Sequence, residues 1–396
     1  MKHLLKKRLL VWLMCIFVIA LGVIYHPANA ASAGNIYYVD IIGGDDHNDG
    51  LSQSKAFKTL GKVNSINYQP GDKILFKASG IWTGQLKFLG SGTGSNPIVI
   101  DMYGSGSKPV IDGAGLVGEG VVYIYNQEYI EVNNLEITND APDAADRRGV
   151  EVIGSNFGTV DHIVLRNLNI HNVKGIAGNS LDAKRTAAIY IATRSDDTVP
   201  TRFNNVLIEG CTIASVDNQG IITNNEIKHS DYPYTQAWNA RRFSNLVIRN
   251  NVISDIGKNA IVTRLSDNTC LVEYNVCYDT AVRAGTGNTI FSRSSAGTVF
   301  QFNEGYRNLT VDYDGCLYNA DLNSVDCIFQ YSYSHDNNHG LFWSCTTSQD
   351  DGNIVRYNIS QNDKGGIFVV NYPTQGLDIY NNTVYIGPNV SPKIIY

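Results

Sequence analysis

The sequence predicts an all-β fold, a single-stranded right-handed parallel β-helix in which the chain winds into a solenoid of short strands. Three observations predict it. A short phrase recurs along the chain, alternating apolar strands separate its copies, and no long helical pattern interrupts them. Charged residues make up only 17% of the chain, below the roughly 25% of typical globular proteins, whereas Gly and Tyr are abundant. The recurring phrase together with this composition indicates a repeat architecture.

The recurring phrase aligns one turn position across successive copies. The aligned residues are Asn134, Asn167, Gly210, Asn250, Tyr274, Phe302, Tyr331, Tyr357 and Asn381. Between copies a Gly or Ala precedes an alternating apolar strand, as in 149–152, 188–191 and 260–263. Each period therefore holds about three strands of three to five residues, and period-2 alternation with short connections favours a β-solenoid.

A polar column lies next to this turn position. It comprises Asn251, Asn275, Asn303, Ser332, Asn358 and Asn382. Side-chain amides stacked at a turn can hydrogen-bond to the next coil, about 4.8 Å away, and satisfy backbone groups of the turn. We therefore expect this ladder to be structural and not catalytic.

The N-terminus has the pattern of a secretory signal peptide, which we predict to be residues 1–30. Basic residues precede an apolar run, 9–24, and the small residues Ala28 and Ala30 follow. The apolar run is short for an uncleaved membrane anchor, which needs about 20 residues. Removing this segment takes four of the 31 basic residues and none of the 37 acidic ones, so the formal charge becomes about −10. That charge argues against non-specific binding to nucleic acid or anionic membranes.

We expect residues 31–115 to form an N-terminal cap and the first coils, and residues 116–396 to form the remaining coils. The apolar spacing within 56–66 predicts a short helix that caps the open end of the solenoid. The chain ends on a strand-like segment, 393–396, with no cap after it. We hypothesise that the sequence is truncated there.

The opening part of the chain resembles the entry module of the pectate-lyase-like superfamily of right-handed parallel β-helices. The residues that carry the resemblance are 37–40, 56–63, 70–77, 96–100 and 108–113. It extends over nearly all of 35–396 and is specific for architecture, because this fold hosts lyases, hydrolases, epimerases and adhesins. It implies a substrate groove whose floor is the strand of the alternating phrase. The long insertions that we expect to wall this groove are 138–148, 171–187, 193–204 and 224–244.

The groove strand has an inward and an outward column in this alignment. The inward column is Ile189, Ile221, Ile261, Ile290, Leu317, Leu341 and Ile367. The outward column is Glu151, Tyr190, Ile222, Val262, Phe291, Tyr318, Phe342 and Phe368. An exposed apolar stripe indicates a binding surface, unless loops cover it. Our candidate substrate contacts are Tyr190, Arg194, Trp238, Tyr318 and His339.

Arg264 and Arg293 fall in one outward column of adjacent coils, so their backbones are expected to lie about 4.8 Å apart. Like charges at that spacing repel unless an anion lies between them. The anion is either a protein carboxylate, for which Asp314 and Asp321 are nearest in sequence, or a substrate uronate. A structural salt-bridge cluster and a catalytic or substrate-binding site both remain open.

Asp312, Asp314 and Asp321 form the densest acidic group on the expected floor. Carboxylate oxygens suit Ca²⁺, which takes six to eight oxygen ligands. Related lyases use calcium to neutralise a uronate carboxylate, so the resemblance implies a calcium site here. An ordinary turn is the alternative, because Asp-Gly is a common turn pair.

Our leading interpretation is a secreted, monomeric polysaccharide lyase that cleaves a uronate-containing extracellular polysaccharide by β-elimination. Calcium or Arg264 would acidify the C5 proton, and Arg293 or Arg264 would remove it. A free Arg has a pKa above about 12, so it must lose its proton transiently or act through water. One alternative is a glycoside hydrolase with Asp314 and Asp321 as its carboxylate pair. The other is a non-catalytic extracellular glycan-binding protein.

Overall fold

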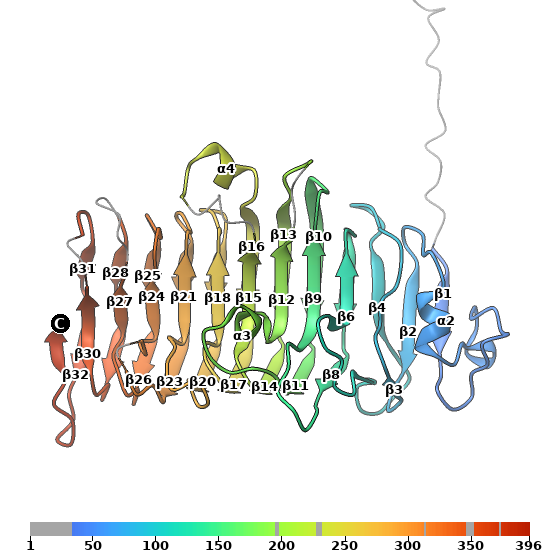
Figure 1. The fold of residues 1–396 in the computed structure, drawn as a ribbon, viewed down its shortest axis with the longest axis horizontal. Helices are drawn as coiled ribbons and strands as arrows, with labels where there is room; N and C mark the ends of the chain where they lie inside the picture. The colour runs from blue at the N-terminus through green and yellow to red at the C-terminus, as the bar shows by residue number, and fades with distance from the viewer. Residues whose placement is uncertain (1–33, 195–197, 227–231, 313, 346–351, 372–373) are drawn as a thin grey trace, which may run out of the picture. The chain divides into compact units, whose positions relative to one another are not determined.

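The computed structural model describes residues 34–194, 198–226, 232–312, 314–345, 352–371 and 374–396. The predicted signal peptide, 1–30, and parts of the insertions 193–204 and 224–244 lie outside the described residues. The described residues from Gly34 onward wind into a solenoid with three parallel sheets, and from β4 onward successive strands join the first, second and third sheet in turn (Figure 1). The predicted fold class, a parallel β-helix, is confirmed.

The strands of the first sheet are β1 (Ile36–Val39), β2 (Lys73–Lys77), β4 (Ile98–Tyr103), β7 (Ile130–Asn133), β10 (Thr159–Arg166), β13 (Arg202–Glu209), β16 (Phe243–Arg249), β19 (Leu271–Glu273), β22 (Val299–Gln301), β25 (Ile328–Gln330), β28 (Ile354–Arg356) and β31 (Asp378–Tyr380). Those of the second are β3 (Ile81–Thr83), β5 (Val110–Asp112), β8 (Glu136–Asn139), β11 (Asn169–Val173), β14 (Thr212–Val216), β17 (Val252–Ile256), β20 (Val276–Thr280), β23 (Glu304–Asn308), β26 (Tyr333–His335), β29 (Ile359–Gln361) and β32 (Thr383–Tyr385). Those of the third are β6 (Gly120–Tyr125), β9 (Arg148–Gly154), β12 (Ala187–Thr193), β15 (Gln219–Asn225), β18 (Ile261–Arg264), β21 (Ile290–Arg293), β24 (Tyr318–Ala320), β27 (Phe342–Ser344), β30 (Gly366–Val370) and β33 (Lys393–Ile395).

The hydrophobic core follows the solenoid axis as stacked columns of inward side chains. Residues in register on the first sheet form one such column, and all of them are fully buried: Ile100, Val132, Leu165, Ile208, Ile248, Val272, Phe300, Phe329 and Val355. Each ring or aliphatic group therefore packs on its counterpart one coil away. This continuous stacking is how residues far apart in sequence become neighbours.

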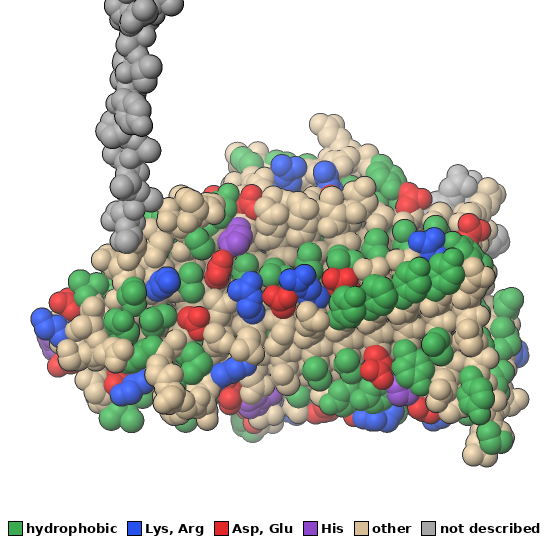
Figure 2. Space-filling model, turned by 180° about the vertical axis from the view of Figure 1, so that it is seen from behind, with side chains coloured by type: hydrophobic (Ala, Val, Ile, Leu, Met, Phe, Trp, Pro, Cys, Tyr) green, Lys and Arg blue, Asp and Glu red, His purple; other side chains and the backbone are tan. Residues whose placement is uncertain are grey.

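The aligned turn position that the sequence predicts has a physical cause in the backbone. All nine of its residues have φ between 52° and 66°, in the left-handed region, which Asn and Gly tolerate best. From Tyr274 to Tyr357 the position holds aromatic rings, and the Tyr274, Phe302, Tyr331 and Tyr357 rings stack with centroids 4.9, 5.4 and 5.1 Å apart. Figure 2 shows a row of hydrophobic side chains along the C-terminal coils of this face. Ring stacking offsets the backbone strain there.

The polar ladder is also confirmed, and it is buried. The Asn275 side-chain oxygen accepts from the backbone N–H of Asn251 (3.1 Å) and from its Nδ2 (2.9 Å). The Asn275 Nδ2 donates to the Asn303 Oδ1 (3.0 Å) and to the Ile248 carbonyl (3.0 Å). The same pattern continues through Ser332, Asn358 and Asn382. The ladder therefore satisfies buried turn groups from coil to coil.

Replacing Asn275 by Ala is expected to destabilise the protein by roughly 2–3 kcal/mol, because each buried group left without a partner costs about 1–3 kcal/mol. The matched control is Asn268→Ala, since Asn268 is exposed and outside the ladder. Urea unfolding followed by circular dichroism measures both variants. Equal midpoints for the two variants would refute a stabilising role of the ladder.

In the part of the chain that the structure describes, helical elements are few and short. They are η1 (Gln53–Lys55), α2 (Leu60–Asn64), α3 (Leu181–Arg185) and α4 (Gln236–Asn239). Helix α2 lies inside the segment 56–66 that the spacing predicts, but it covers only five residues, with Leu60 and Val63 buried. None of the helices formed by the described residues has the length and apolar character of a membrane span.

Candidate active site

The third sheet presents two outward columns. The first is Tyr123, Glu151, Tyr190, Ile222, Val262, Phe291, Asn319 and Trp343. In the second column Arg264 of β18 pairs directly with Arg293 of β21, as the sequence predicts. Asp321 comes next, because its backbone N–H follows β24 and donates to the carbonyl of Ser292 on β21 (2.9 Å). Cations and a carboxylate thus meet at the end of three adjacent strands.

A cavity of about 260 Å³ lies over these columns. Its lining is Asn179, Lys184, Gln219, Ile222, Asn224, Lys258, Asn259, Val262, Arg264, Asn288, Phe291, Arg293, Asp314, Asn319, Asp321 and Trp343. The four residues that the sequence nominates for chemistry, Arg264, Arg293, Asp314 and Asp321, all line it. The structure therefore brings the two predicted arginines and the predicted carboxylate pair to one site.

The arginine pair has a protein carboxylate beside it. Arg293 Nη1 lies 2.9 Å from Asp321 Oδ2, and both side chains are partly buried. Arg264 donates through Nη1 to the Asn224 side chain, one coil away. One of the two partners that the sequence leaves open, a protein carboxylate, therefore lies beside Arg293.

Asp314 has a different environment from Asp321. Its carboxylate accepts from the Asn288 amide and from the Thr286 hydroxyl (3.3 Å). The pKa of Asp314 is raised to about 6, mainly by burial and also by the charges of Asp312 and Asp321, which together outweigh the lowering effect of Lys258. Asp314 is thus suited to carry a proton in mildly acidic solution, beside an ion-paired Asp321.

Removing the charge of Asp314 is expected to stabilise the protein at neutral pH. In the folded state Asp314 keeps its proton up to about pH 6, whereas an unfolded Asp loses it near pH 4. The stabilisation that comes from the protonated folded form is therefore fully present below pH 4 and is lost as the pH rises through 6. Asp314→Asn avoids this loss, so its advantage over wild type should grow from pH 4 to 7 by roughly 1–3 kcal/mol. Unfolding midpoints measured across this range test it, and a difference that does not change with pH would contradict it.

The three aspartates do not fit a calcium site. Asp312 is exposed, does not line the cavity, and uses Oδ1 to accept from the Asp314 backbone N–H (2.9 Å). Asp321 already pairs with Arg293, and among the described residues no group of three or more His, Cys, Asp or Glu is placed to hold a metal ion. Calcium binding stays a prediction from the sequence.

Tyr318 does not face the groove. It pairs with Ile290 and Phe342 in the inward column, is fully buried, and its hydroxyl bonds Ser332 (2.6 Å) and Asn303 (3.0 Å). The sequence alignment is one residue out of register from β24 onward, and such a slip sends every side chain to the opposite face. Asn319 and Trp343 are the outward residues that the alignment misses. The alternation in 318–321, with polar residues at 319 and 321, is the signal that reveals the correct register.

The other nominated substrate contacts do not line the cavity. Trp238 is buried in the loop of α4, where its Nε1 donates to the Ser294 carbonyl (2.6 Å). His339 is buried against Cys316, with 3.4 Å between Nδ1 and Sγ. Tyr190 stands in the outward column but is fully buried, and Arg194 pairs with Glu151 (2.8 Å). Because these side chains are buried or bonded to other residues of the protein, they are not available to contact a ligand in the cavity.

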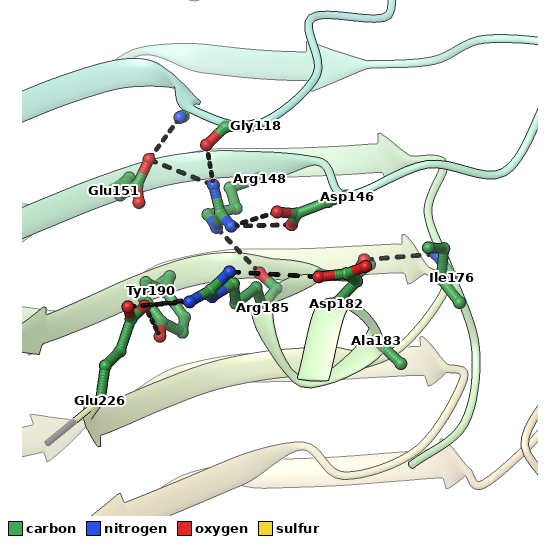
Figure 3. A network of polar contacts seen from close by, with 12 residues as sticks. Gly118, Asp146, Arg148, Glu151, Ile176, Asp182, Ala183, Arg185, Tyr190 and Glu226 are labelled. Atoms are coloured by element: carbon green, nitrogen blue, oxygen red, sulfur yellow. Dashed lines mark hydrogen bonds and ion pairs between the residues drawn. The ribbon is translucent and has the colours of Figure 1, made fainter. Parts of the chain in front are cut away.

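A polar network surrounds Tyr190 on the coils before the cavity (Figure 3). Arg148, only 1% exposed, lies between the carboxylates of Asp146 (2.7 Å) and Glu151 (3.3 Å) and donates to the Gly118 and Arg185 carbonyls. Arg185 in turn pairs with Glu226 (2.9 Å), which bonds the Tyr190 hydroxyl (2.8 Å). This network fixes α3 against the third sheet.

The insertion 171–187 forms part of the cavity wall, as predicted. It carries α3 and supplies Asn179 and Lys184 to the lining, and Figure 1 shows α3 beside β15. The Asn218 side chain donates to the Ala183 carbonyl, and Lys258 donates to the Asn179 side chain. The loop is therefore attached to the coils that form the floor.

Comparisons with known proteins find similar chains among carbohydrate-active enzymes of this fold. No family model matches the sequence. A lacto-N-biosidase of Bifidobacterium longum subsp. longum is 30% identical over 447 aligned positions, which cover 91% of this chain and 28% of that protein. The chain thus spans about 28% of the length of the curated relative that it matches.

Solved structures agree. A GH136 lacto-N-biosidase from Eubacterium ramulus superposes with a TM-score of 0.75 and 24–25% identity, covering 89% of this chain and 68% of that one. A rhamnogalacturonan lyase superposes with a TM-score of 0.51 and 11% identity, covering 89% and 87%. The second likeness is one of fold alone.

The leading expectation, cleavage by β-elimination, is wrong. The relatives matched at 24–30% identity are lacto-N-biosidases, which are glycoside hydrolases and not lyases. The paired arginines suggested a lyase base, but Arg293 lies in an ion pair with Asp321. The hydrolase alternative fits the relatives better. By its fold, the chain is a right-handed parallel β-helix, the architecture that its resemblance to the pectate-lyase-like superfamily implies.

Proposed function

We propose that this protein is a glycoside hydrolase whose carboxylate pair is Asp314 and Asp321. The observation that carries the proposal is that both line one cavity but have different environments. Burial raises the pKa of Asp314 to about 6, whereas Asp321 forms an ion pair with Arg293. Two carboxyl groups in different protonation states are what glycosidic hydrolysis needs.

Asp314 is the general acid. It donates its proton to the glycosidic oxygen as the bond from that oxygen to the anomeric carbon breaks. Asp321 is the second carboxylate, which either attacks the anomeric carbon or activates the water that does. In both cases the oxygen of a water molecule is finally bonded to the anomeric carbon, and the products are two shorter saccharides.

The substrate class comes from the relatives. Both are named lacto-N-biosidases, so we propose a glycan with a lacto-N-biose unit as the substrate. Trp343 and Phe291 on the cavity wall offer apolar surfaces to a sugar ring, and Asn319 and Asn288 offer amides to its hydroxyls. The signal-peptide pattern of residues 1–30 supports the further proposal that the enzyme acts outside the cell.

Incubation with 4-nitrophenyl β-lacto-N-bioside and with a lacto-N-biose-terminated oligosaccharide tests the proposal. We expect release of the disaccharide as a reducing sugar, with no ultraviolet absorbance from an unsaturated uronate. Absence of release from both substrates would contradict the proposal, and binding without release would support the glycan-binding alternative. Proton NMR of the first-formed anomer assigns Asp321 as nucleophile if the configuration is retained, or as base if it is inverted.

A further inference from the structure

The side chain of Asn288 connects the proposed general acid to the preceding coil. Asn288 lies two residues before β21, lines the cavity and is only 3% exposed. Its Nδ2 donates to Asp314 Oδ1, and its Oδ1 accepts from the backbone N–H of Cys316 (2.8 Å). The backbone next to it adds a bond from the Gly287 N–H to the Asp314 carbonyl (2.6 Å). One coil therefore holds the part of the next coil that carries Asp314 through both its side chain and its backbone.

The orientation of the Asn288 amide follows from its two partners. A backbone N–H can only donate, so the amide atom that faces the N–H of Cys316 is the oxygen. The amide nitrogen then faces Asp314, and this nitrogen can only donate. Asp314 Oδ1 is therefore an acceptor whether or not the carboxyl group is protonated.

This arrangement leaves one oxygen of Asp314 to carry the acid proton. A protonated carboxyl group has one O–H donor and one carbonyl acceptor, and the acceptor here is Oδ1. The proton is therefore on Oδ2, whose neighbour is the Thr286 hydroxyl at 3.3 Å. A hydroxyl group both donates and accepts, so this contact is compatible with the protonated and with the ionised carboxyl group.

The amide of Asn288 differs in direction from amides that stabilise the solenoid. Its counterpart on the preceding coil, Asn259, donates to Gln219, which lies one coil further toward the N-terminus (2.8 Å). The ladder residue Asn275 likewise accepts from the backbone N–H of Asn251 on the coil before it. Asn288 instead turns both its oxygen and its nitrogen toward the following coil. A role in the ladder does not explain this direction.

We propose that Asn288 is a positioning residue for acid catalysis, which holds Asp314 so that the proton is on Oδ2 and is passed from there to the glycosidic oxygen. The inference rests on the proposed function and adds a residue to it. As the Oδ2–H bond breaks, the proton bonds to the leaving oxygen and Asp314 becomes a carboxylate, to which Asn288 continues to donate. Because Nδ2 has a second hydrogen, this bond is compatible with a contact between Asn288 and a sugar hydroxyl.

Proton NMR of the full wild-type chain tests the contact without requiring turnover. The pKa of Asp314 is raised to about 6, mainly by burial. We therefore expect one side-chain amide proton of Asn288 to change its chemical shift with a midpoint near pH 6, because its acceptor gains a charge there. In Asp314→Asn this titration should disappear. An Asn288 amide that does not titrate in the wild type would overturn the proposal.

Replacing Asn288 by Ala is expected to affect acid catalysis in a way that a loss of stability does not. A donor to Oδ1 stabilises the ionised carboxylate, so its removal should raise the pKa of Asp314 and move the alkaline limb of kcat upward by about one pH unit. We also expect kcat to fall by roughly 10–100-fold on the oligosaccharide and by less than about threefold on the 4-nitrophenyl substrate. Asn288→Leu, which leaves less space for a substitute water molecule, should give the same pattern.

Asn275→Ala is the matched control, because it also removes a buried amide whose oxygen accepts a backbone N–H. It should lower stability but keep the wild-type pH profile and the wild-type ratio of activities on the two substrates. The charged groups that act on Asp314, namely Lys258, Asp312 and Asp321, are the same in all these variants. An unchanged alkaline limb in the Asn288 variants, or equal losses on both substrates, would count against the positioning role.

These measurements separate the two proposals. Hydrolysis by the wild type together with an Asn288 amide that does not titrate would reject this inference and leave the proposed function in place. Titration of the Asn288 amide in a protein that hydrolyses neither substrate would reject the proposed function, and would leave the assignment of the Asp314 proton to Oδ2.

Discussion

Replacing Asp321 by Asn is expected to lower kcat by roughly 10³-fold or more, because the variant loses the carboxylate that attacks the anomeric carbon or activates water. Asp321 lines the cavity and pairs with Arg293, so Asn keeps the shape of the side chain and removes its charge. The measurement is steady-state hydrolysis of the 4-nitrophenyl glycoside and of the oligosaccharide. The loss should be similar for both substrates.

Asp314→Asn should give a different pattern, and this contrast tests the assignment of roles. A general acid matters most when the leaving group is a poor one. We therefore expect a loss of roughly 10²–10⁴-fold on the oligosaccharide and a much smaller loss on the 4-nitrophenyl substrate, whose leaving group needs little protonation. Asp279→Asn is the control, because Asp279 pairs with Arg307 on the second sheet, away from the cavity lining. Equal losses on both substrates for Asp314→Asn would refute its role as the acid.

The second large effect is expected at Arg148, whose replacement by Met should destabilise the protein by roughly 3–5 kcal/mol. Arg148 is 1% exposed and lies between Asp146 and Glu151, and Glu151 is itself fully buried. The change removes the donor that Arg148 gives to Asp146 and to the Gly118 and Arg185 carbonyls, and it leaves the buried Glu151 with one arginine, Arg194, in place of two. The weaker compensation of these partly and fully buried groups is what makes the effect large. Burial raises the pKa of Glu151, whereas the charges of Arg148 and Arg194 lower it. The ionised form of Glu151 therefore depends on these two arginines.

Arg307→Met is the matched control for Arg148→Met. Arg307 also pairs with a carboxylate, Asp279 at 2.7 Å, but its side chain is 48% exposed, so we expect a loss of about 1 kcal/mol or less. Urea unfolding midpoints compare the two variants. If both variants lose the same small amount, the network in Figure 3 contributes nothing beyond an exposed ion pair.

The sequence predicted the architecture because the repeat itself carries that information. Each copy places Asn, Gly or an aromatic ring where the backbone turns through the left-handed region, and each copy from Asn250 onward adds an Asn or Ser to the ladder. These are local requirements of one coil, repeated from coil to coil. For the same reason the pairing of Arg264 with Arg293 could be predicted, since both lie on strands of regular spacing.

The candidate site was predicted only in part. Arg264, Arg293, Asp314 and Asp321 were nominated correctly as neighbours, but Tyr318 was placed on the wrong face and Trp343 was missed. Strands β24 and β27 have only three residues each, so their period-2 pattern is too short to exclude a slip by one position. Trp238 was nominated for its aromatic ring, although a loop aromatic packs on its own protein as readily as on a sugar.

By itself, the sequence determined the solenoid, its turn column and the approximate position of a polar site, because those depend on spacing along one repeating chain. Only the tertiary structure decided which side chains face the cavity and that Asp321 pairs with Arg293. It also decided that burial raises the pKa of Asp314. Protonation and exposure depend on what surrounds a group in space, including the loop 171–187 that comes from other coils. No pattern within one repeat contains that information.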